Sequence, residues 1–333
     1  MTDSQAAPSA GRLRPLALVA LAIGYLHVVF GAIVRITGSG YGCGNHWPKC
    51  QDAWFPPLER TDLIIELAHR YLALALTAAV VGLVLAALSR RAEPGVAGAG
   101  GILRPAALAS LLVLIAAAFG AIIVKLDLQN RYVVVVHVGL AMAILAALAV
   151  AAVRAGAFGR ATADAGGGSR KTFRGARVLA ALVFVVLVLG ALTANLPGAS
   201  FSCTGFPLCR NGYGPEFPYQ HVQLAHRVLA FLVLFHALGL LIGVRRRAES
   251  PQMRRWASAA FGTILLQLLL AAAMVELHLP AWSRSAHQAL GTATWLVAVI
   301  FVALAWRASG GTGAAVGAVV PHAPLVGAAA ARS

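Results

Sequence analysis

Charged residues are scarce in this 333-residue sequence. Asp, Glu, Lys and Arg together make up 11% of it, whereas 59% is hydrophobic and the mean hydropathy is +0.79. A water-soluble domain needs a more polar surface than so few charges can provide. The composition therefore excludes an ordinary soluble protein and is typical of one that lies in a lipid bilayer.

Polar residues do not interrupt the long hydrophobic runs. A helix crosses a bilayer with about 20 mainly apolar residues. Eight runs meet this length: Leu16–Ile36, Leu63–Leu88, Ala106–Val124, Tyr132–Val153, Val178–Ala194, Val222–Val244, Ala257–Val275 and Ala286–Trp306. Because they are continuous and rich in Leu, Ala and Val, they predict an all-α integral membrane protein rather than a barrel. The first run is too long for a signal-peptide core, and we expect it to be a retained span.

Acidic residues are rare even among the charged ones, with 11 Asp and Glu against 27 Lys and Arg. The net charge of +16 accompanies no nucleic-acid-binding module, so we expect no nucleic-acid partner. With both termini placed inside, 18 Lys and Arg fall on the inner side and 9 on the outer side. This asymmetry follows the positive-inside rule. It predicts cytoplasmic termini, a bacterial inner-membrane location and contact with anionic membrane lipid.

Cysteine is limited to four residues, and neither pair has the C-x-x-C spacing typical of zinc sites or of covalent haem attachment. All four lie in predicted outer loops, two in 37–62 and two in 195–221. An oxidising compartment outside the membrane permits disulfides. We expect one bridge in each loop, Cys43–Cys50 and Cys203–Cys209, with four free thiols as the alternative.

The sequence contains an internal repeat. "VFGAIVRITGSGYGCGNHWPKC" begins at Val29 and "VLGALTANLPGASFSCTGFPLC" begins at Val188, and a His-Arg dipeptide follows each in the next span. The repeat predicts two four-helix bundles related by a pseudo-two-fold axis along the membrane normal. The predicted division is a cytoplasmic N-terminal segment 1–15, a first bundle 16–154, a cytoplasmic linker 155–176, a second bundle 177–307 and a flexible cytoplasmic tail 308–333.

Four of the ten histidines occupy equivalent repeat positions near the outer ends of the even-numbered spans: His69, His137, His226 and His287. At about 1.5 Å per residue, all four lie at a similar depth, within about 10 Å of the outer surface. Facing helices of a bundle are where cofactor sites are built, and two imidazoles suit axial ligation of a haem iron. A lone intramembrane histidine is more often a packing residue or part of a proton path. The matched positions favour haem ligation.

The other histidines lack this pattern. We assign His27 and His236 to packing or a hydrogen bond in mid-span, His46, His221 and His278 to the rim of a site near the outer loops, and His322 to the tail without a role.

Glu66 breaks the symmetry of the repeat. It lies three residues before His69 on the same helical face, where the second copy has Gln223. A carboxylate near the bilayer is costly and marks function. It can take a proton or stabilise positive charge on a substrate carbon. The alternative is a plain ion pair with Arg70 or Arg35.

Three arginines also lie near the predicted outer face: Arg35, Arg70 and Arg227. We expect them to bind haem propionates, because guanidinium groups pair well with carboxylates. Snorkelling of the side chains to the membrane interface is the alternative.

The "VRITGSG" turn, the Cys–Trp-Pro–Cys loop, the E-x-x-H-R motif and the duplicated eight-span layout resemble the haem A synthase family over about residues 16–307. The resemblance implies an oxidoreductase that converts the C8 methyl of haem O to the formyl group of haem A, used by terminal oxidases. The reaction would run through successive hydroxylations and loss of water from a gem-diol. A six-coordinate iron leaves two routes open: one histidine leaves, or electrons are withdrawn from the haem and water attacks the methyl carbon.

The resemblance also implies roles for individual residues. His69 and His137 match the ligands of the substrate or product, haem O or haem A, in the N-terminal bundle. His226 and His287 match those of a bound haem b in the C-terminal bundle. Glu66 matches the catalytic carboxylate, and Cys43 and Cys50 match an outer-loop disulfide. The loop "CGNHWPKC" is one residue longer than the family's Cys-Pro-Asp-Trp-Pro-x-Cys and lacks its Pro-Asp.

The partners expected from this resemblance are the haem O substrate, a haem O synthase and an electron acceptor. One alternative function is a quinol-oxidising bis-His dihaem electron-transfer cytochrome, which has no special need for Glu66 in one copy only. Another is a parallel-repeat transporter, which would require charged or broken helices in mid-membrane. The sequence has little charge there.

Overall fold

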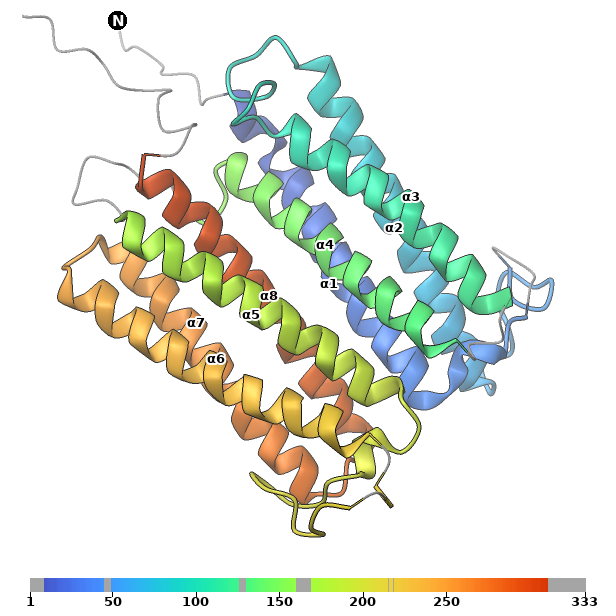
Figure 1. Cartoon of the computed structure of the whole chain (residues 1–333). Coiled ribbons are helices and arrows are strands. Elements are labelled where there is room, and N and C mark those ends of the chain that lie inside the picture. The colour runs from blue at the N-terminus through green and yellow to red at the C-terminus, as the bar shows by residue number, and fades with distance from the viewer. Residues whose placement is uncertain are drawn as a thin grey trace, which may run out of the picture.

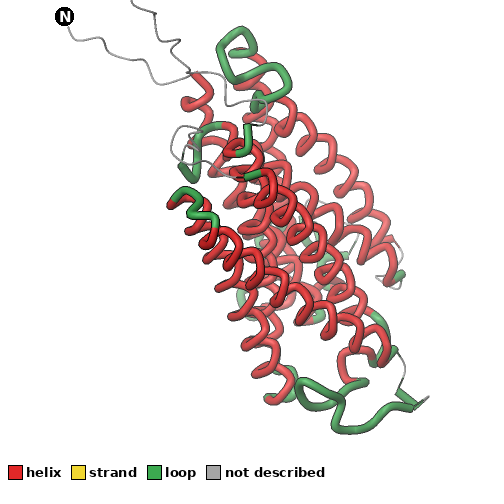
Figure 2. The backbone as a smooth tube through the Cα atoms, turned by 60° about the vertical axis from the view of Figure 1, so that its left-hand side comes forward, coloured by secondary structure: helices red, strands yellow, loops and turns green. Residues whose placement is uncertain are grey.

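The computed structural model describes residues 9–44, 49–125, 130–159, 169–214, 216–217 and 219–310. These residues form eight long helices and three short 3₁₀ helices, with no named strand among them (Figures 1 and 2). The long helices are α1 (Arg14–Thr37), α2 (Thr61–Ser89), α3 (Leu103–Lys125), α4 (Arg131–Arg154), α5 (Arg170–Asn195), α6 (Gln220–Arg246), α7 (Pro251–Glu276) and α8 (Ala281–Ala308). The short ones are η1 (Ser9–Leu13), η2 (Ser39–Tyr41) and η3 (Ala199–Phe201).

All eight long helices have the length and apolar composition to cross a membrane. This confirms the prediction of an all-α multi-pass membrane protein with eight spans. Large apolar side chains on the helix surfaces stay exposed, as a lipid environment requires: Leu85 is 60% exposed, Leu114 64% and Phe235 63%.

Two helices begin well before their apolar runs. The runs start at Val178 and Ala257, whereas α5 starts at Arg170 and α7 at Pro251. In both cases a serine caps the helix: Ser169 accepts from the backbone N–H of Thr172, and Ser250 accepts from that of Met253. Serine is a favoured N-cap, and proline suits the first helical position. Hydropathy marks only the apolar part of such a helix.

The helices form two groups of four (Figure 1). Contacts link α1 with α2 and α4, and α3 with α2 and α4; the same pattern links α5 to α8. Between the groups, α1 contacts α8, α4 contacts α5, and α4 contacts α8. Exchanging each helix with its counterpart in the other copy leaves this set of contacts unchanged. The helix packing therefore follows the predicted pseudo-two-fold relation.

Small residues bring the two groups together. The facing sides of α4 and α8 carry fully buried alanines, including Ala149, Ala152 and Ala305. Small side chains let helix backbones approach closely within a membrane. At the same interface the indole N–H of Trp295 donates to the carbonyl of Met142 at 2.8 Å. The interface between the copies is thus part of one continuous core.

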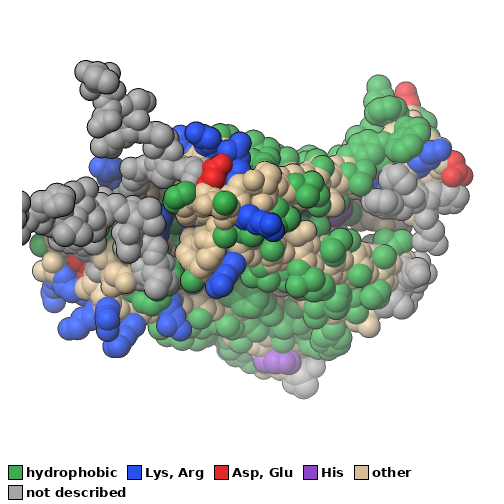
Figure 3. Space-filling view, turned by 90° about the horizontal axis from the view of Figure 1, so that it is seen from above, with side chains coloured by type: hydrophobic (Ala, Val, Ile, Leu, Met, Phe, Trp, Pro, Cys, Tyr) green, Lys and Arg blue, Asp and Glu red, His purple; other side chains and the backbone are tan. Residues whose placement is uncertain are grey.

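The two ends of the molecule differ. One end carries both disulfide loops and is named the outer end; the other, near the N-terminus, is named the inner end. Most Lys and Arg side chains visible in Figure 3 gather toward the inner end, whereas hydrophobic side chains cover the middle. Residues 160–168 of the predicted linker, 311–333 of the predicted tail, His46 and His322 lie outside the described residues.

Candidate functional site

The first bundle brings His69 and His137 together near the outer end, one from α2 and one from α4. Both imidazoles are half-buried. They lie close enough to repel each other if both were protonated. The Nδ1 atoms of both rings are buried and have no hydrogen-bond partner in the described structure. Each ring nevertheless lies near a backbone carbonyl, that of His27 for His69 and that of Ala116 for His137.

The second bundle likewise places His226 of α6 and His287 of α8 near each other, and both are half-buried. Nδ1 of His226 lies 3.0 Å from the carbonyl oxygen of Val186. A carbonyl oxygen only accepts, so Nδ1 carries the proton and Nε2 of the neutral ring keeps its lone pair. Such a second partner on a histidine is the usual way to orient a metal ligand.

A glycine makes room for one histidine in each copy. A Cβ at Gly31 of α1 would lie 3.0 Å from Cε1 of His69, and a Cβ at Gly190 of α5 would lie 3.0 Å from Cε1 of His226. The repeat alignment places Gly31 and Gly190 at equivalent positions. Each imidazole thus packs against helix backbone at a distance that any larger residue would disturb.

The surroundings of the two pairs differ. The ring of His27 stacks on that of His69, with centroids 4.3 Å apart and an interplanar angle of 9°. The repeat aligns His27 with Val186, so the second pair has no such neighbour. In the second bundle, Nε2 of Gln267 lies 3.1 Å from Nδ1 of His287 and donates to its carbonyl at 2.9 Å. The first pair has an extra imidazole and the second has an amide.

The contact of His27 with His69 was not predicted from the sequence. Its signal was present, because His27 lies four residues before Gly31 and therefore on the same face of α1. The repeat comparison did not reveal it, because His27 has no histidine counterpart in the second copy.

Glu66 is buried at 5% exposure and uses both carboxylate oxygens. Oε2 accepts from the backbone N–H of Cys43 at 2.8 Å, and Oε1 accepts from Nη2 of Arg70 at 2.6 Å. Gln223 makes comparable contacts in the second copy: its Oε1 accepts from the hydroxyl of Ser202, and its amide donates to the carbonyl of Ser200. No hydrogen bond joins Glu66 to His69 among the described residues. Its catalytic role stays a prediction.

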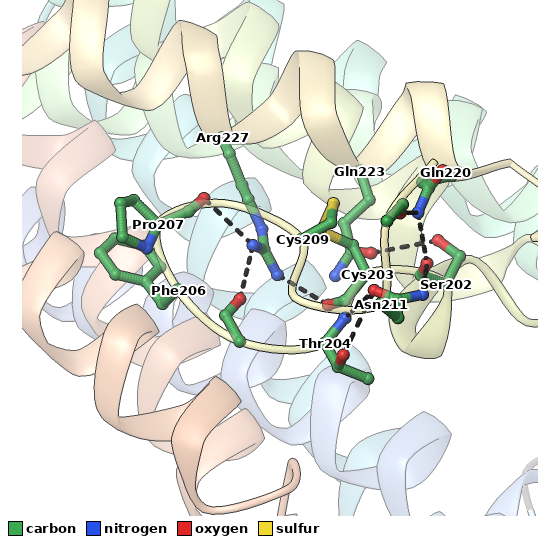
Figure 4. Close-up of a disulfide and its surroundings, with 12 residues drawn as sticks. Ser202, Cys203, Thr204, Phe206, Pro207, Cys209, Asn211, Gln220, Gln223 and Arg227 are labelled. Carbon is green, nitrogen blue, oxygen red and sulfur yellow. Dashed lines mark hydrogen bonds between the residues drawn. A yellow bond between two sulfur atoms is a disulfide. The ribbon is translucent and has the colours of Figure 1, made fainter. Parts of the chain in front are cut away.

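Both disulfides are present, Cys43–Cys50 and Cys203–Cys209. The arginine that follows the first matched histidine of each copy anchors the adjacent loop. Arg70 donates to the carbonyls of Lys49 and Gly44. Arg227 donates to the carbonyls of Cys203, Gly205 and Pro207, and Figure 4 shows its guanidinium enclosed by the loop.

Arg70 and Arg227 therefore contact loop carbonyls in this structure, and their predicted pairing with haem propionates stays a prediction. Arg35 lies elsewhere, at the end of α1, where Nη1 donates to the carbonyl of Ala194 in the other copy at 3.2 Å. Arg284 of α8 returns the contact by donating to the carbonyl of Ile36 at 3.1 Å.

Arg284 is a residue that sequence reasoning missed. It lies three residues before His287, just as Glu66 lies three residues before His69, and this spacing was the available signal. Its Nε is buried without a hydrogen-bond partner in the described structure. Arg35 and Arg284 are close enough to repel each other. Together they place two positive charges between the bundles at the outer end.

The remaining histidines lie outside both pairs. Nε2 of His236 is 3.0 Å from the carbonyl of Gly175, in agreement with a hydrogen bond in mid-span. His221 is exposed beside Tyr219, and His278 follows the end of α7 with a positive φ of 61°.

The described residues contain no group of three or more His, Cys, Asp or Glu side chains that could hold a bare metal ion. A haem iron requires only two protein ligands, because the porphyrin supplies the other four. The half-buried rings, and the glycine that packs against one ring of each pair, fit haem ligation by both pairs.

Comparison with known proteins agrees with this chemistry. Residues 14–299 match the sequence family COX15-CtaA, described as cytochrome oxidase assembly protein. A protein named heme A synthase from Symbiobacterium thermophilum is 32% identical over 298 residues, which cover 85% of this chain and 92% of that protein. Another heme A synthase, from Staphylococcus haemolyticus, is 28% identical over 281 residues, covering 83% and 90%.

A third relative has a different name and a greater length. A protein from Thermus thermophilus, named protoheme IX farnesyltransferase, is 31% identical over 316 residues. The match covers 90% of this chain but 49% of that protein. This chain therefore spans about half the length of the Thermus protein.

Proposed function

Because the chain belongs to the COX15-CtaA family of cytochrome oxidase assembly proteins, we propose that it is a haem A synthase. The relatives named heme A synthase support this activity. The observation that carries the proposal is the duplicated imidazole pair, with a buried carboxylate beside only one of the two copies. A plain dihaem electron carrier has no need for that asymmetry.

The proposed reaction is an oxidation of the C8 methyl of haem O. Two successive hydroxylations convert the methyl group to a gem-diol, and loss of water leaves the formyl group of haem A. Each hydroxylation withdraws two electrons, so an electron acceptor is part of the proposal. His69 and His137 would hold the substrate in the first bundle.

The second bundle would hold a resident haem b through His226 and His287. When bound, this haem supplies a one-electron redox centre. The protein contributes orientation: the bond from Nδ1 of His226 to Val186 fixes the tautomer, and Gln267 contacts the ring of His287. The bond to Val186 leaves the lone pair on Nε2 of His226 available for the iron.

Glu66 would act on the substrate from a fixed position. The N–H of Cys43 and the guanidinium of Arg70 hold its carboxylate in place. An ionised carboxylate can accept the proton that is released when a hydroxyl group forms on the methyl carbon. It can also stabilise positive charge on that carbon. Gln223 cannot ionise, so only the first bundle would carry out the chemistry.

Haem O carries a farnesyl tail, and such a substrate would enter from the lipid. Val136 next to His137 is 47% exposed on the helix surface, which supports access from the side. The name of the Thermus relative supports a functional link with the prenyl-transfer reaction that must supply a farnesylated haem. We place the protein in the bacterial inner membrane with both termini in the cytoplasm, following the positive-inside rule.

Glu66→Gln tests the proposal. The variant should fold, because Gln223 shows that glutamine at this position can hold the loop. We expect it to bind haem but to leave haem O unconverted, as measured by chromatography and mass analysis of the extracted haems. Gln223→Glu is the matched control and should keep full conversion. Haem A production by Glu66→Gln at the normal rate would overturn the role of Glu66. A wild-type protein that binds haem but leaves added haem O unchanged would overturn the function.

A further inference from the structure

A groove at the inner end lies where the two copies meet. It has a volume of about 390 Å³ and is formed by α4 of the first copy and by α5 and α8 of the second. Its lining is mainly apolar and includes Phe173, Val299 and Trp306. Three arginines also line it: Arg154 at the end of α4, Arg177 in α5 and Arg307 at the end of α8. The two histidine pairs near the outer end do not include any of these residues.

The arginines make this groove strongly positive. Arg154 is close enough to Arg307 and Arg104 to be repelled by both. None of the ion pairs among the described residues includes Arg154 or Arg177. Nη1 of Arg154 donates to the carbonyl of Gly101. This bond uses one of the five N–H donors of the Arg154 guanidinium. Arg177 is exposed and lies over the ring of Phe173, 5.5 Å from its centroid.

The position of the groove identifies the kind of ligand. It lies at the inner end of membrane-spanning helices, where lipid headgroups meet the ends of the hydrocarbon chains. We infer that the groove binds an anionic phospholipid. Its acyl chains would pack against the apolar lining, and its phosphate would lie among the arginines. Basic pockets between transmembrane helices bind such headgroups.

The chemistry argues against other occupants. A zwitterionic lipid would bring a cationic group toward three guanidinium groups, which is unfavourable. A free phosphate ion would satisfy the arginines but would leave the apolar lining without a partner. Of these three, only an anionic phospholipid matches both parts of the groove. Because the groove is shared by α4, α5 and α8, the bound lipid would also hold the two bundles together.

The experiment uses the full-length protein in a mild detergent, titrated with phosphatidylglycerol, cardiolipin or phosphatidylcholine. Native mass spectrometry counts the bound lipid. We expect retention of the two anionic lipids and little retention of phosphatidylcholine. Arg177→Gln should weaken anionic binding about fivefold, the effect of roughly one basic residue near a headgroup. Arg177→Lys should restore most of it.

Arg174→Gln is the matched control. Arg174 is also exposed near the start of α5, but it does not line the groove. The variant therefore removes the same charge from a nearby position outside the groove. Equal weakening by Arg174→Gln and Arg177→Gln would overturn the site, as would equal retention of phosphatidylcholine. Displacement of the lipid by millimolar inorganic phosphate would assign an ion site instead and would also overturn the inference. An unchanged haem spectrum in each variant shows that it is folded. Bound lipid is counted directly, so the result does not depend on haem A synthesis.

Discussion

At the scale of single residues, position in the repeat predicted more than residue type did. The four matched histidines lie on α2, α4, α6 and α8 with a neighbouring imidazole in each copy, and their ligation of haem stays a prediction. The arginines behave differently. Sequence places Arg70 and Arg227 near the outer face, but it does not say which way their long side chains turn. Each turns toward the backbone of its own disulfide loop, because that short loop has carbonyls without partners in secondary structure.

The two arginines should contribute unequally to stability. Arg70 and Glu66 form an ion pair with side chains only 8% and 7% exposed, whereas Arg227 bonds only neutral carbonyls and faces Gln223. Arg70→Ala leaves a buried carboxylate without its partner and should cost about 3–5 kcal/mol. Arg227→Ala loses charged hydrogen bonds and should cost about 1.5–3 kcal/mol. Thermal unfolding of the purified proteins compares the two. The double variant Glu66→Gln/Arg70→Ala should recover part of the loss, and equal costs for the two single variants would contradict the argument.

The glycines beside the histidines carry a second prediction at this scale. A methyl group at Gly31 or Gly190 would come within 3.0 Å of an imidazole and force the ring to move. We expect Gly31→Ala and Gly190→Ala each to reduce haem content and alter the absorption spectrum. The overpacking should lower the stability of the protein by about 1–3 kcal/mol. The identity of the haem that is lost shows which bundle each glycine serves. Gly239→Ala, where a Cβ meets nothing within 4 Å, is the control. Haem content equal to that of the control in both variants would rule the idea out.

At the scale of helices, the sequence predicted all eight spans but not all of their ends. Hydrophobic runs report where the helix lies in hydrocarbon, and they stop at the first charged residues. The beginnings of α5 and α7 depend instead on the hydrogen bonds of Ser169 and Ser250. Such caps are local features of side-chain geometry, and a serine in a basic, glycine-rich stretch gives only a weak signal before the structure is known.

A buried carboxylate joins two helices at the inner end. Oε1 of Glu249, which follows α6, accepts from the hydroxyls of Ser169 and Thr172 and from Nε of Arg247. Burial by itself would raise the pKa of Glu249, but the hydrogen bonds from Thr172, Arg247 and Ser169 outweigh it and lower the pKa below its ordinary value of 4.5. The carboxylate therefore stabilises the fold when it is ionised, and its contribution is complete above that ordinary pKa.

This lowered pKa predicts a pH dependence of stability. Glu249→Gln should lower the melting temperature at pH 7. The difference from wild type should shrink as the pH falls below about 4.5 and through the lower pKa of the folded state. Glu93→Gln is the control, because the ion pair of Glu93 with Arg90 is 31% and 37% exposed and is worth at most about 1 kcal/mol. A difference between Glu249→Gln and wild type that grows on acidification would contradict the sign of the shift.

At the scale of the whole molecule, the internal repeat predicted two similar bundles but not how they join. The side chains that make the joining hydrogen bonds differ from those at the equivalent positions of the other copy. Tyr25 donates to the carbonyl of Ala289, Arg35 to that of Ala194 and Arg284 to that of Ile36. Such contacts cannot be found by aligning the copies, because a pseudo-symmetric interface need not use equivalent side chains. The same reasoning explains why Arg284 was missed.

The extent of this interface predicts that the two halves associate without a covalent connection. Contacts of α1 with α8 and of α4 with α5 and α8 bury a continuous apolar core, and Trp295, Arg35 and Arg284 add hydrogen bonds across it. If the chain is expressed as two pieces divided between residues 159 and 169, a tag on one piece should co-purify the other in equal amount. Trp295→Ala should weaken this association, because it removes a large buried side chain and its bond to Met142. The expected loss of stability is about 3–5 kcal/mol. Phe231→Ala, which removes an aromatic contact with Phe206 inside the second piece, is the comparison. Recovery of the tagged half alone from mild detergent would show that the core across the two copies is too weak to hold them, and that the connecting segment does so instead.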